Sequence, residues 1–217
     1  MSVEVVVKVV STIASQVADL DDPLATDDTT NGDPYRVLIS CVLSQRTKEE
    51  VTSVASKRLF ARASTPEEMI GLSIEEIGAL IYPVGFWRTK ARHVRDLSIR
   101  IRTDHNGRVP STIEDLLSLP GVGRKTANLV LSSGFGLPAI CVDTHVHRIM
   151  NRLGFVETSS PNETESALRR TLPRSLWLDI NYLLVLFGRN VCTPLSPKCS
   201  RCVVREYCHQ VGVLRFR

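Results

Sequence analysis

The stretch "LPGVGRKTAN" (residues 119–128) separates two helix-like segments and decides the fold that we expect. Gly121 and Gly123 flank a single valine, and glycine permits positive φ angles and a close approach of backbones. The surrounding "IEDLLSLPGVGRKTANLVLSSG" therefore predicts a helix, a tight turn and a second helix. A nucleoside-triphosphate P-loop is excluded, because it needs glycine directly before its lysine, whereas Arg124 precedes Lys125.

The start of the second helix is a candidate anion site. Its first backbone N–H groups have no intrahelical partners, and with the helix dipole they favour an anion such as a DNA phosphate. A plain connector between two helices is the alternative interpretation. Lys125 stands in this first turn, where the dipole, Arg124 and partial burial would each disfavour its charged form. Lys125 is therefore a candidate amine nucleophile, with an ordinary phosphate contact as its simpler role.

Composition limits the kind of protein. The chain has 217 residues, 43% hydrophobic content and a net charge of +4, which suits one large domain or two small ones with an ample core. No stretch has the roughly 18 apolar residues that a membrane span needs. The N-terminus lacks the pattern of a secretory signal. We expect a monomer, located in the cytoplasm of a prokaryote with the nucleoid, or in a nucleus.

Helix signals recur along the chain and strand alternation is scarce, so the predicted fold class is all-α. The segment "YRVLISCVLSQ" (residues 35–45) reads as a buried helix, although its β-branched content leaves a strand open. Other helices are expected at residues 3–20, 48–62, 88–107, 161–171 and 174–189, with a polar loop at 21–34. Three capping boxes are predicted: Thr65 with Glu68, Ser73 with Glu76, and Ser111 with Glu114.

A basic run covers residues 88–102, with one acidic residue, Asp96, among six basic ones. Such a run indicates either a solvated helix face or a nucleic-acid surface, and the run alone does not distinguish them. The six are Arg88, Lys90, Arg92, Arg95, Arg100 and Arg102.

The stretch "CVDTHVHRIMNRLGF" follows the hairpin and begins another helix. Asp143 or Thr144 is a natural N-cap, and a capped Asp143 could also present its carboxylate to the site around Lys125. His145 could donate to a phosphate, or it could simply be exposed. His145 and His147 do not share one helical face, which argues against a zinc pair.

Four of the six cysteines fall within the seventeen residues 192–208, with the spacing C-x6-C-x2-C-x5-C. Four thiolates can hold zinc or an iron–sulfur cluster, and the spacing alone leaves both open. Basic residues inside this segment, Lys198, Arg201 and Arg205, indicate an anionic partner. Cys41 and Cys141 lie in apolar runs and are expected to be buried bystanders. The four candidate metal ligands are Cys192, Cys199, Cys202 and Cys208.

Jointly, "LSQRT", "VGFWRTKA", "LPGVGRKTAN", "VDTHVHR" and the cysteine spacing make the chain resemble the endonuclease III family of DNA repair glycosylases, in the helix–hairpin–helix superfamily. The resemblance implies a 4Fe–4S cluster on the four cysteines. It also implies a two-lobed glycosylase fold. One lobe, residues 27–137, would be a six-helix barrel that contains the hairpin. The other, residues 1–26 and 138–217, would be the cluster lobe.

The resemblance also implies residue roles. Lys125 would be the nucleophile and Asp143 the catalytic carboxylate. Gln45 and Phe86 would be wedges inserted into the duplex. The remaining DNA contacts would come from Gly121, Gly123, Arg124, His145 and Arg201. Three residues depart from the best-known bacterial pattern. Arg46 follows Gln45 where a small residue is usual, Phe86 replaces a leucine wedge, and His147 replaces a bulky apolar residue. These departures affect which damaged base is preferred and leave the reaction class unchanged.

We expect a bifunctional glycosylase and abasic-site lyase. It would act on oxidised pyrimidines in duplex DNA, through a Schiff base and β-elimination. Its partner would be double-stranded DNA that contains damaged bases or abasic sites. Two alternatives remain: a monofunctional glycosylase that removes mismatched thymine or uracil, and a non-catalytic DNA-binding module stabilised by metal.

Overall fold

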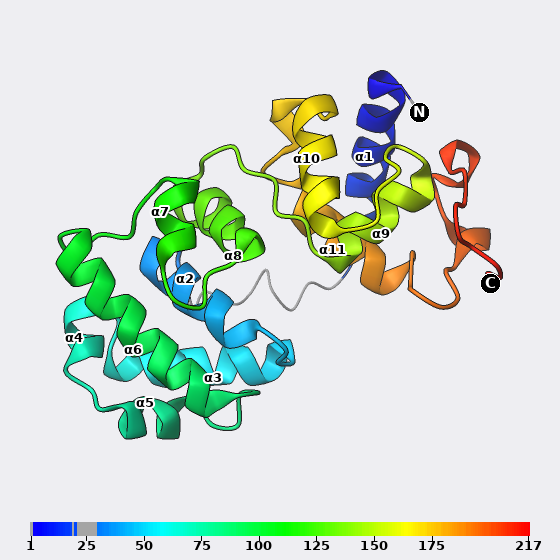
Figure 1. Cartoon of the computed structure of the whole chain (residues 1–217). Helices are drawn as coiled ribbons and strands as arrows, with labels where there is room; N and C mark the ends of the chain where they lie inside the picture. Colours follow the sequence, from blue (N-terminus) through cyan, green and yellow to red (C-terminus); the bar gives the residue numbers. More distant parts are fainter. Residues whose placement is uncertain (1, 19, 21–29) are drawn as a thin grey trace. The chain divides into compact units, whose positions relative to one another are not determined.

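The computed structural model describes residues 2–18, 20 and 30–217, so most of the polar loop expected at 21–34 lies outside the described residues. The chain divides into two compact units (Figure 1). We call Leu24–Leu137 the central unit, and Met1–Pro23 with Pro138–Arg217 the terminal unit.

The predicted all-α class is confirmed. Every regular element in the described ranges is helical, and these ranges contain no strand. Across the described part of the chain, no helix combines the length and apolarity that crossing a membrane would require.

The central unit holds α2 to α8 and the π-helical segment η1 (Figure 1). The segment that could have been a strand is a helix, α2, because Asp33 caps it by accepting from the Arg36 N–H and Pro34 starts it. The fully buried side chains of this unit include Leu38, Leu59, Ile77, Leu97 and Leu116. The elements are α2 (Pro34–Ser44), α3 (Glu49–Arg62), α4 (Pro66–Ile70), α5 (Ile74–Ile81), α6 (Trp87–Asp104), α7 (Ile113–Ser118), α8 (Arg124–Leu129) and η1 (Val130–Gly134).

Two of the three predicted capping boxes are confirmed. Thr65 with Glu68 begins α4, and Ser73 with Glu76 begins α5. The third prediction, Ser111 with Glu114, is wrong. Thr112 caps α7 instead, because its side chain accepts from the Asp115 N–H and the helix therefore begins one residue later.

The terminal unit brings the N-terminal helix α1 (Val3–Ala18) against a helix far along the chain, α11 (Ile180–Asn190). The period of Val5, Val9, Ile13 and Val17 predicts the stripe of α1. The last three are buried, whereas Val5 is half-buried and Val6 and Val10 complete the buried face. The segment expected as one helix at 174–189 is divided, since α11 begins only at Ile180. The other elements are α9 (Thr144–Leu153), α10 (Pro161–Thr171) and the 3₁₀ turns η2 (Arg174–Leu176), η3 (Cys199–Arg201) and η4 (Arg205–Tyr207).

Candidate functional site

The hairpin turn lies between α7 and α8 in the central unit. Gly121 has φ +78°, and a Cβ on it would lie 2.8 Å from His93 Nδ1, so both conformation and space require glycine here. Gly123 does not have the positive φ or the close backbone approach that the sequence predicts for it. Its φ is −106°, and a Cβ added to it would have no atom within 4 Å. It is the N-cap of α8 and gives that helix no side-chain cap. The turn therefore exposes backbone that a ligand can approach closely.

Lys125 lies in the first turn of α8 and is exposed, so the partial burial that was expected for it is not found. Lys125 interacts electrostatically with Cys41 of α2, a neighbour that the sequence did not predict. Burial raises the pKa of the Cys41 thiol to about 12, and the Lys125 charge acts in the opposite direction. Cys41 is thus within electrostatic reach of the candidate nucleophile. Its apolar sequence context gave no sign of this.

Two loops of the central unit carry the candidate wedges. The α2–α3 loop (residues 45–48) presents Gln45, whose Nε2 donates to the Gly121 carbonyl at 2.9 Å. The α5–α6 loop (residues 82–86) ends at Phe86, whose side chain is 64% exposed. The Arg46 guanidinium lies 5.8 Å from the Phe86 ring centroid, in a cation–π contact. The fold therefore brings Gln45 to the hairpin and Arg46 to Phe86.

The basic run of residues 88–102 is largely engaged within the protein. Lys90 is only 4% exposed, so its assignment to a solvated or DNA-facing surface is wrong. Its Nζ donates to the carbonyls of Leu43 and Gln45 and to the Thr47 hydroxyl. Burial lowers the pKa of Lys90 to about 8. Other members of the run are also occupied: Arg95 with the Leu72 carbonyl, Arg100 with the Ser118 carbonyl and Asp104, and Arg102 with Glu67.

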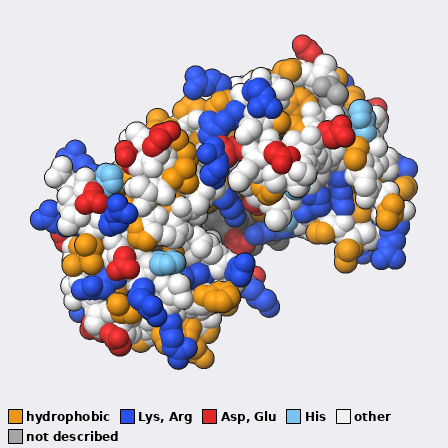
Figure 2. Space-filling view, viewed as in Figure 1, with side chains coloured by type: hydrophobic (Ala, Val, Ile, Leu, Met, Phe, Trp, Pro, Cys, Tyr) orange, Lys and Arg blue, Asp and Glu red, His pale blue; other side chains and the backbone are white. Residues whose placement is uncertain are grey.

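On the face in Figure 2, Lys and Arg side chains are spread among acidic ones over both units. Local contacts, more than net charge, therefore identify the cations that remain candidates for binding DNA.

Asp143 lies in the terminal unit and is the N-cap of α9. Its Oδ1 accepts from the N–H groups of His145 at 2.8 Å and Val146 at 2.9 Å, so Asp143, and not Thr144, is the cap. The residue is half-buried. Both hydrogen bonds use one carboxylate oxygen, and they fix the direction of the other.

His145 is half-buried beside α11. A Cβ on Gly188 would lie 2.4 Å from His145 Nδ1, so this packing needs glycine. Arg148 Nη2 lies 3.2 Å from the same nitrogen and 2.9 Å from the Cys192 carbonyl. Because guanidinium can only donate, Nδ1 accepts and Nε2 carries the proton of the neutral ring. Arg148 thus links His145 to the cysteine segment.

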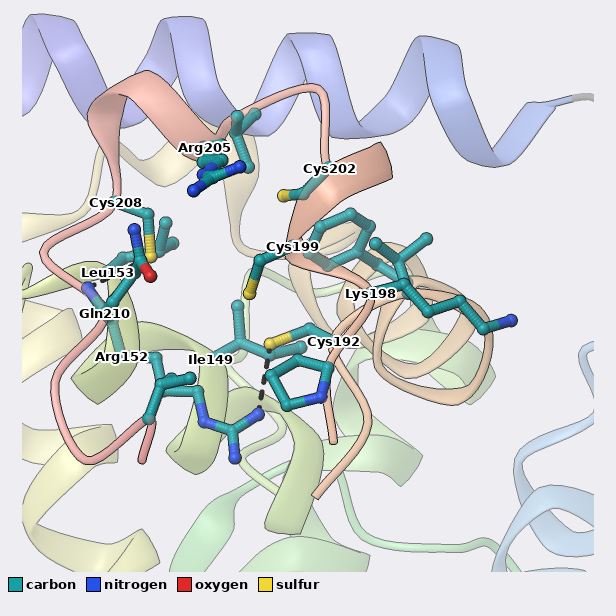
Figure 3. A pocket seen from close by; sticks show the side chains of 15 residues that line it. Ile149, Arg152, Leu153, Cys192, Lys198, Cys199, Cys202, Arg205, Cys208 and Gln210 are labelled. Carbon is teal, nitrogen blue, oxygen red and sulfur yellow. Dashed lines mark hydrogen bonds between the residues drawn. The ribbon is translucent and has the colours of Figure 1, made fainter. Parts of the chain in front are cut away.

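The four tail cysteines line one cavity in the terminal unit, together with apolar side chains such as Ile149 and Leu153 (Figure 3). Cys192 follows α11, Cys199 begins η3, Cys202 follows η3 and Cys208 follows η4. Lys198 extends away from the sulfurs (Figure 3).

Several N–H groups point at these sulfurs. Arg152, which is 9% exposed, donates from Nη1 to Cys192 Sγ at 3.4 Å, and the Gln210 N–H donates to Cys208 Sγ at 3.4 Å (Figure 3). Burial raises the pKa of Cys202 to about 11, and a bond from the Val204 N–H opposes that rise. Donors of this kind stabilise metal-bound thiolate sulfur.

A four-iron cluster spreads its ligands, since each thiolate binds a different iron atom. In the described part of the chain, no three His, Cys, Asp or Glu side chains are grouped closely enough to hold one metal ion. The shared cavity and the N–H donors to sulfur fit an iron–sulfur cluster.

Two family models match the sequence. Residues 39–174 match HhH-GPD superfamily base excision DNA repair proteins. Residues 192–208 match the iron–sulfur binding domain of endonuclease III. The second match spans the four cysteines that line the cavity.

Individual proteins are similar over most of the chain. Endonuclease III of Thermotoga maritima is 51% identical over 176 residues, which cover 81% of this chain and 83% of that protein. A solved structure of a trapped endonuclease III–DNA covalent intermediate is 33% identical, with a TM-score of 0.84 over 97% of each chain. The structure of a thermostable thymine-DNA glycosylase is 28% identical, with a TM-score of 0.83 over 93% of this chain and 94% of that one.

Proposed function

The chain belongs to the HhH-GPD superfamily of base excision DNA repair proteins, in its endonuclease III group, and from this premise we propose that it removes oxidised pyrimidines from duplex DNA. The reaction class is that of the group: a DNA glycosylase with abasic-site lyase activity. The chain carries a 4Fe–4S cluster. The observation that carries the proposal is the hairpin, where Lys125 follows the open Gly123 and Gln45 contacts Gly121.

Lys125 is the proposed nucleophile. Its amine attacks C1′ of the damaged nucleotide, the bond from C1′ to the base breaks, and the base leaves with a proton. The sugar ring then opens as the C1′–O4′ bond breaks and O4′ takes up a proton, which leaves a Schiff base at C1′. The Schiff base acidifies C2′, and loss of a C2′ proton drives the β-elimination that breaks the C3′–O bond to the 3′ phosphate. The exposure of Lys125 on the first turn of α8 supports this role, because the attacking nitrogen must reach a sugar carbon.

Asp143 is the proposed catalytic carboxylate. It stabilises positive charge that develops on the sugar and assists the proton transfers. The two hydrogen bonds to its Oδ1 support this role, because a carboxylate that is already oriented needs no reorganisation during the reaction.

Gln45 and Phe86 are the proposed wedges. The target nucleotide has to leave the base stack before its C1′ can be attacked, and inserted side chains can fill the gap. Both residues are exposed at the ends of neighbouring loops, and Gln45 also touches the hairpin.

Phosphates are the proposed ligands of the hairpin backbone at Gly121 and Gly123 and of the side chains of Arg124, His145 and Arg201. These contacts are independent of sequence, as expected of an enzyme that searches DNA for damage. Arg201 is exposed, and the contact of Arg148 with His145 Nδ1 leaves Nε2 as the ring nitrogen that can donate. The partner is duplex DNA with a damaged base or an abasic site. We expect light scattering to give the mass of one chain.

Cys192, Cys199, Cys202 and Cys208 are the proposed cluster ligands. The cluster, once bound, supplies a cross-link between four points of the chain. The chain itself contributes the N–H donors from Arg152 and Gln210 and the apolar wall around the sulfurs. The proposed role of this arrangement is to order the segment that carries Arg201.

A second candidate is removal of mismatched thymine or uracil without strand cleavage. The likeness to a thymine-DNA glycosylase favours it, and Arg46 and Phe86 stand where the best-known endonuclease III pattern has other residues. The presence of Lys125 favours the bifunctional reaction, since an amine is required for the Schiff base.

The test is a panel of duplexes, each with one oxidised pyrimidine, one G·T mismatch or one G·U mismatch. Base release and strand cleavage are measured separately, the latter without alkali. We expect release at the oxidised pyrimidine with cleavage at a similar rate. Release confined to the mismatches, with breaks only after alkali, would establish the second candidate instead.

A further inference from the structure

Lys90 is a buried charged residue for which the proposed reaction has no direct use. It lies on the buried stripe of α6, with Val94, Leu97 and Ile101. An ammonium group has three N–H donors, and lysine is almost never fully buried unless these are paired. The structure supplies three acceptors: the Leu43 carbonyl at 2.8 Å, the Thr47 hydroxyl at 3.0 Å and the Gln45 carbonyl. Packing alone would need only an apolar side chain at this position.

Lys90 makes contacts with the loops of both wedge residues, Gln45 and Phe86. The Lys90 side chain holds the backbone of Gln45 in the α2–α3 loop. The Lys90 backbone N–H donates to the Phe86 carbonyl at 3.0 Å, in the α5–α6 loop. This second bond is the first backbone bond of α6, which any residue at position 90 would make, so the Lys90 side chain reaches the Phe86 loop through Thr47.

The Thr47 hydroxyl joins the same network. It accepts from Lys90 Nζ at 3.0 Å and from the Gly85 N–H at 3.1 Å, and it is placed to donate to the Gln45 carbonyl at 3.2 Å. A hydroxyl has one donor and two acceptor sites, so these three contacts use its full capacity. Gly85 lets the loops meet, because a Cβ there would lie 2.7 Å from the Arg46 carbonyl oxygen.

The loops are held in conformations that they would not favour in isolation. Arg46 has φ +51° and Phe86 has φ +58°, both in the left-handed region that costs energy for residues with a Cβ. Such conformations persist where the surrounding structure determines them. Lys90 donates to Gln45 and Thr47, which lie on either side of Arg46. Next to Phe86, the Thr47 hydroxyl accepts from the Gly85 N–H, and the Lys90 backbone N–H donates to the Phe86 carbonyl.

We propose that Lys90 is a positioning residue that fixes Gln45 and Phe86 as one rigid unit for insertion into duplex DNA. The inference rests on the proposed wedge roles of those two side chains. Lys90 touches neither the sugar nor the base. It acts by keeping the wedges in the geometry that fills the gap, so that base extrusion does not require the loops to reorganise.

The test compares Lys90→Met, Phe86→Ala and the double variant. Methionine keeps the length of the side chain and removes every donor. Two reactions are measured: single-turnover base excision from a duplex, and strand cleavage of a single-stranded abasic oligonucleotide, where no base-stack gap has to be filled. The duplex carries whichever base the wild-type enzyme releases, so a wrong damage assignment leaves the comparison intact. Lys57→Met, on the exposed face of α3, controls for the loss of one lysine charge.

We expect Lys90→Met to slow duplex excision by at least about tenfold, because small displacements of positioning groups have large kinetic effects. Cleavage of the single-stranded substrate should stay within about twofold, and the double variant should be little slower than Phe86→Ala alone, since both changes remove one function. Thr47→Val breaks the same network with little change of shape. It should give the same pattern, and it replaces Lys90→Met if that variant does not fold.

Three results would overturn the inference. Equal losses on both substrates would show that Lys90 acts through general stability. Independent, multiplicative effects of Lys90→Met and Phe86→Ala would show that they serve different functions. Unchanged duplex excision by Phe86→Ala would show that Phe86 is not a wedge, and the positioning role of Lys90 would then be wrong. The proposed reaction at Lys125 would be unaffected by that result.

Discussion

Asp143 combines a structural task with its proposed chemical one. As the N-cap of α9 it accepts two backbone N–H bonds through Oδ1. Asparagine caps helices about as well as aspartate, whereas alanine costs about 1 kcal/mol of stability at such a position. Asp143→Asn therefore removes the negative charge and keeps the helix cap, whereas Asp143→Ala removes both.

We expect Asp143→Asn to fold and bind DNA like the wild type but to excise the base about 10²-fold more slowly, since the charge that assists the reaction is gone. Thermal unfolding and single-turnover kinetics check this. Asp143→Ala should show the same kinetic defect and a lower Tm as well. Full activity in Asp143→Asn would reduce Asp143 to a cap.

Lys90 shows what a reading of charge along the sequence misses. Residues 88–102 look like a basic face, yet the positions 90, 94, 97 and 101 follow the helical period of the buried stripe of α6. That period was the available signal. The acceptors of Lys90 come from residues 43–47, and only the fold brings them to it.

At the scale of elements, local signals were good guides. The caps at Thr65 and Ser73 depend on side chains three residues apart, so the sequence predicts them without the fold. The misplaced cap at Ser111 has a local cause, since Thr112 offers a competing hydroxyl one residue later. The segment 174–189 was harder, because Asp179 makes no side-chain cap hydrogen bond and so gives no local signal that α11 begins at Ile180.

The cap of α4 should depend on pH. The Glu68 carboxylate accepts from the N–H groups of Ser64 at 2.7 Å and Thr65 at 3.2 Å, and these bonds hold its pKa below the usual 4.5. A lowered pKa means that the stabilisation is fully present above pH 4.5 and is lost as the pH falls through the folded-state pKa.

We therefore expect the wild type to be more stable than Glu68→Gln at pH 7, and the difference to shrink towards pH 3. Glutamine keeps an acceptor oxygen but does not titrate. Thermal unfolding of both proteins across this range is the measurement. A difference that stays constant with pH would contradict the assignment.

At the scale of the whole molecule, the cluster should couple metal content to folding of the terminal unit. We expect Cys199→Ser to lose iron and visible absorbance and to make the terminal unit sensitive to protease. Cys41→Ala, outside the cysteine tail, should keep its iron. Full iron content in Cys199→Ser would remove this residue from the ligand set.

DNA affinity should fall steeply with salt, because phosphate contacts release counterions. We expect Arg201→Ala to lower affinity equally for all sequences and to reduce the slope of log K against log salt by about 1. Arg102→Ala is the matched control, since Arg102 already pairs with Glu67 at 3.1 Å. Equal slopes for Arg201→Ala and the wild type would show that Arg201 makes no phosphate contact.

The assignment of Lys125 as the covalent nucleophile is tested most directly by borohydride reduction during the reaction. With a duplex that carries an oxidised pyrimidine, the wild-type enzyme should give a stable protein–DNA adduct. Lys125→Gln should bind the same duplex and give no adduct, because glutamine keeps most of the side chain but cannot form an imine. A Lys125→Gln protein that still cleaves an abasic site through a trappable imine would contradict the assignment.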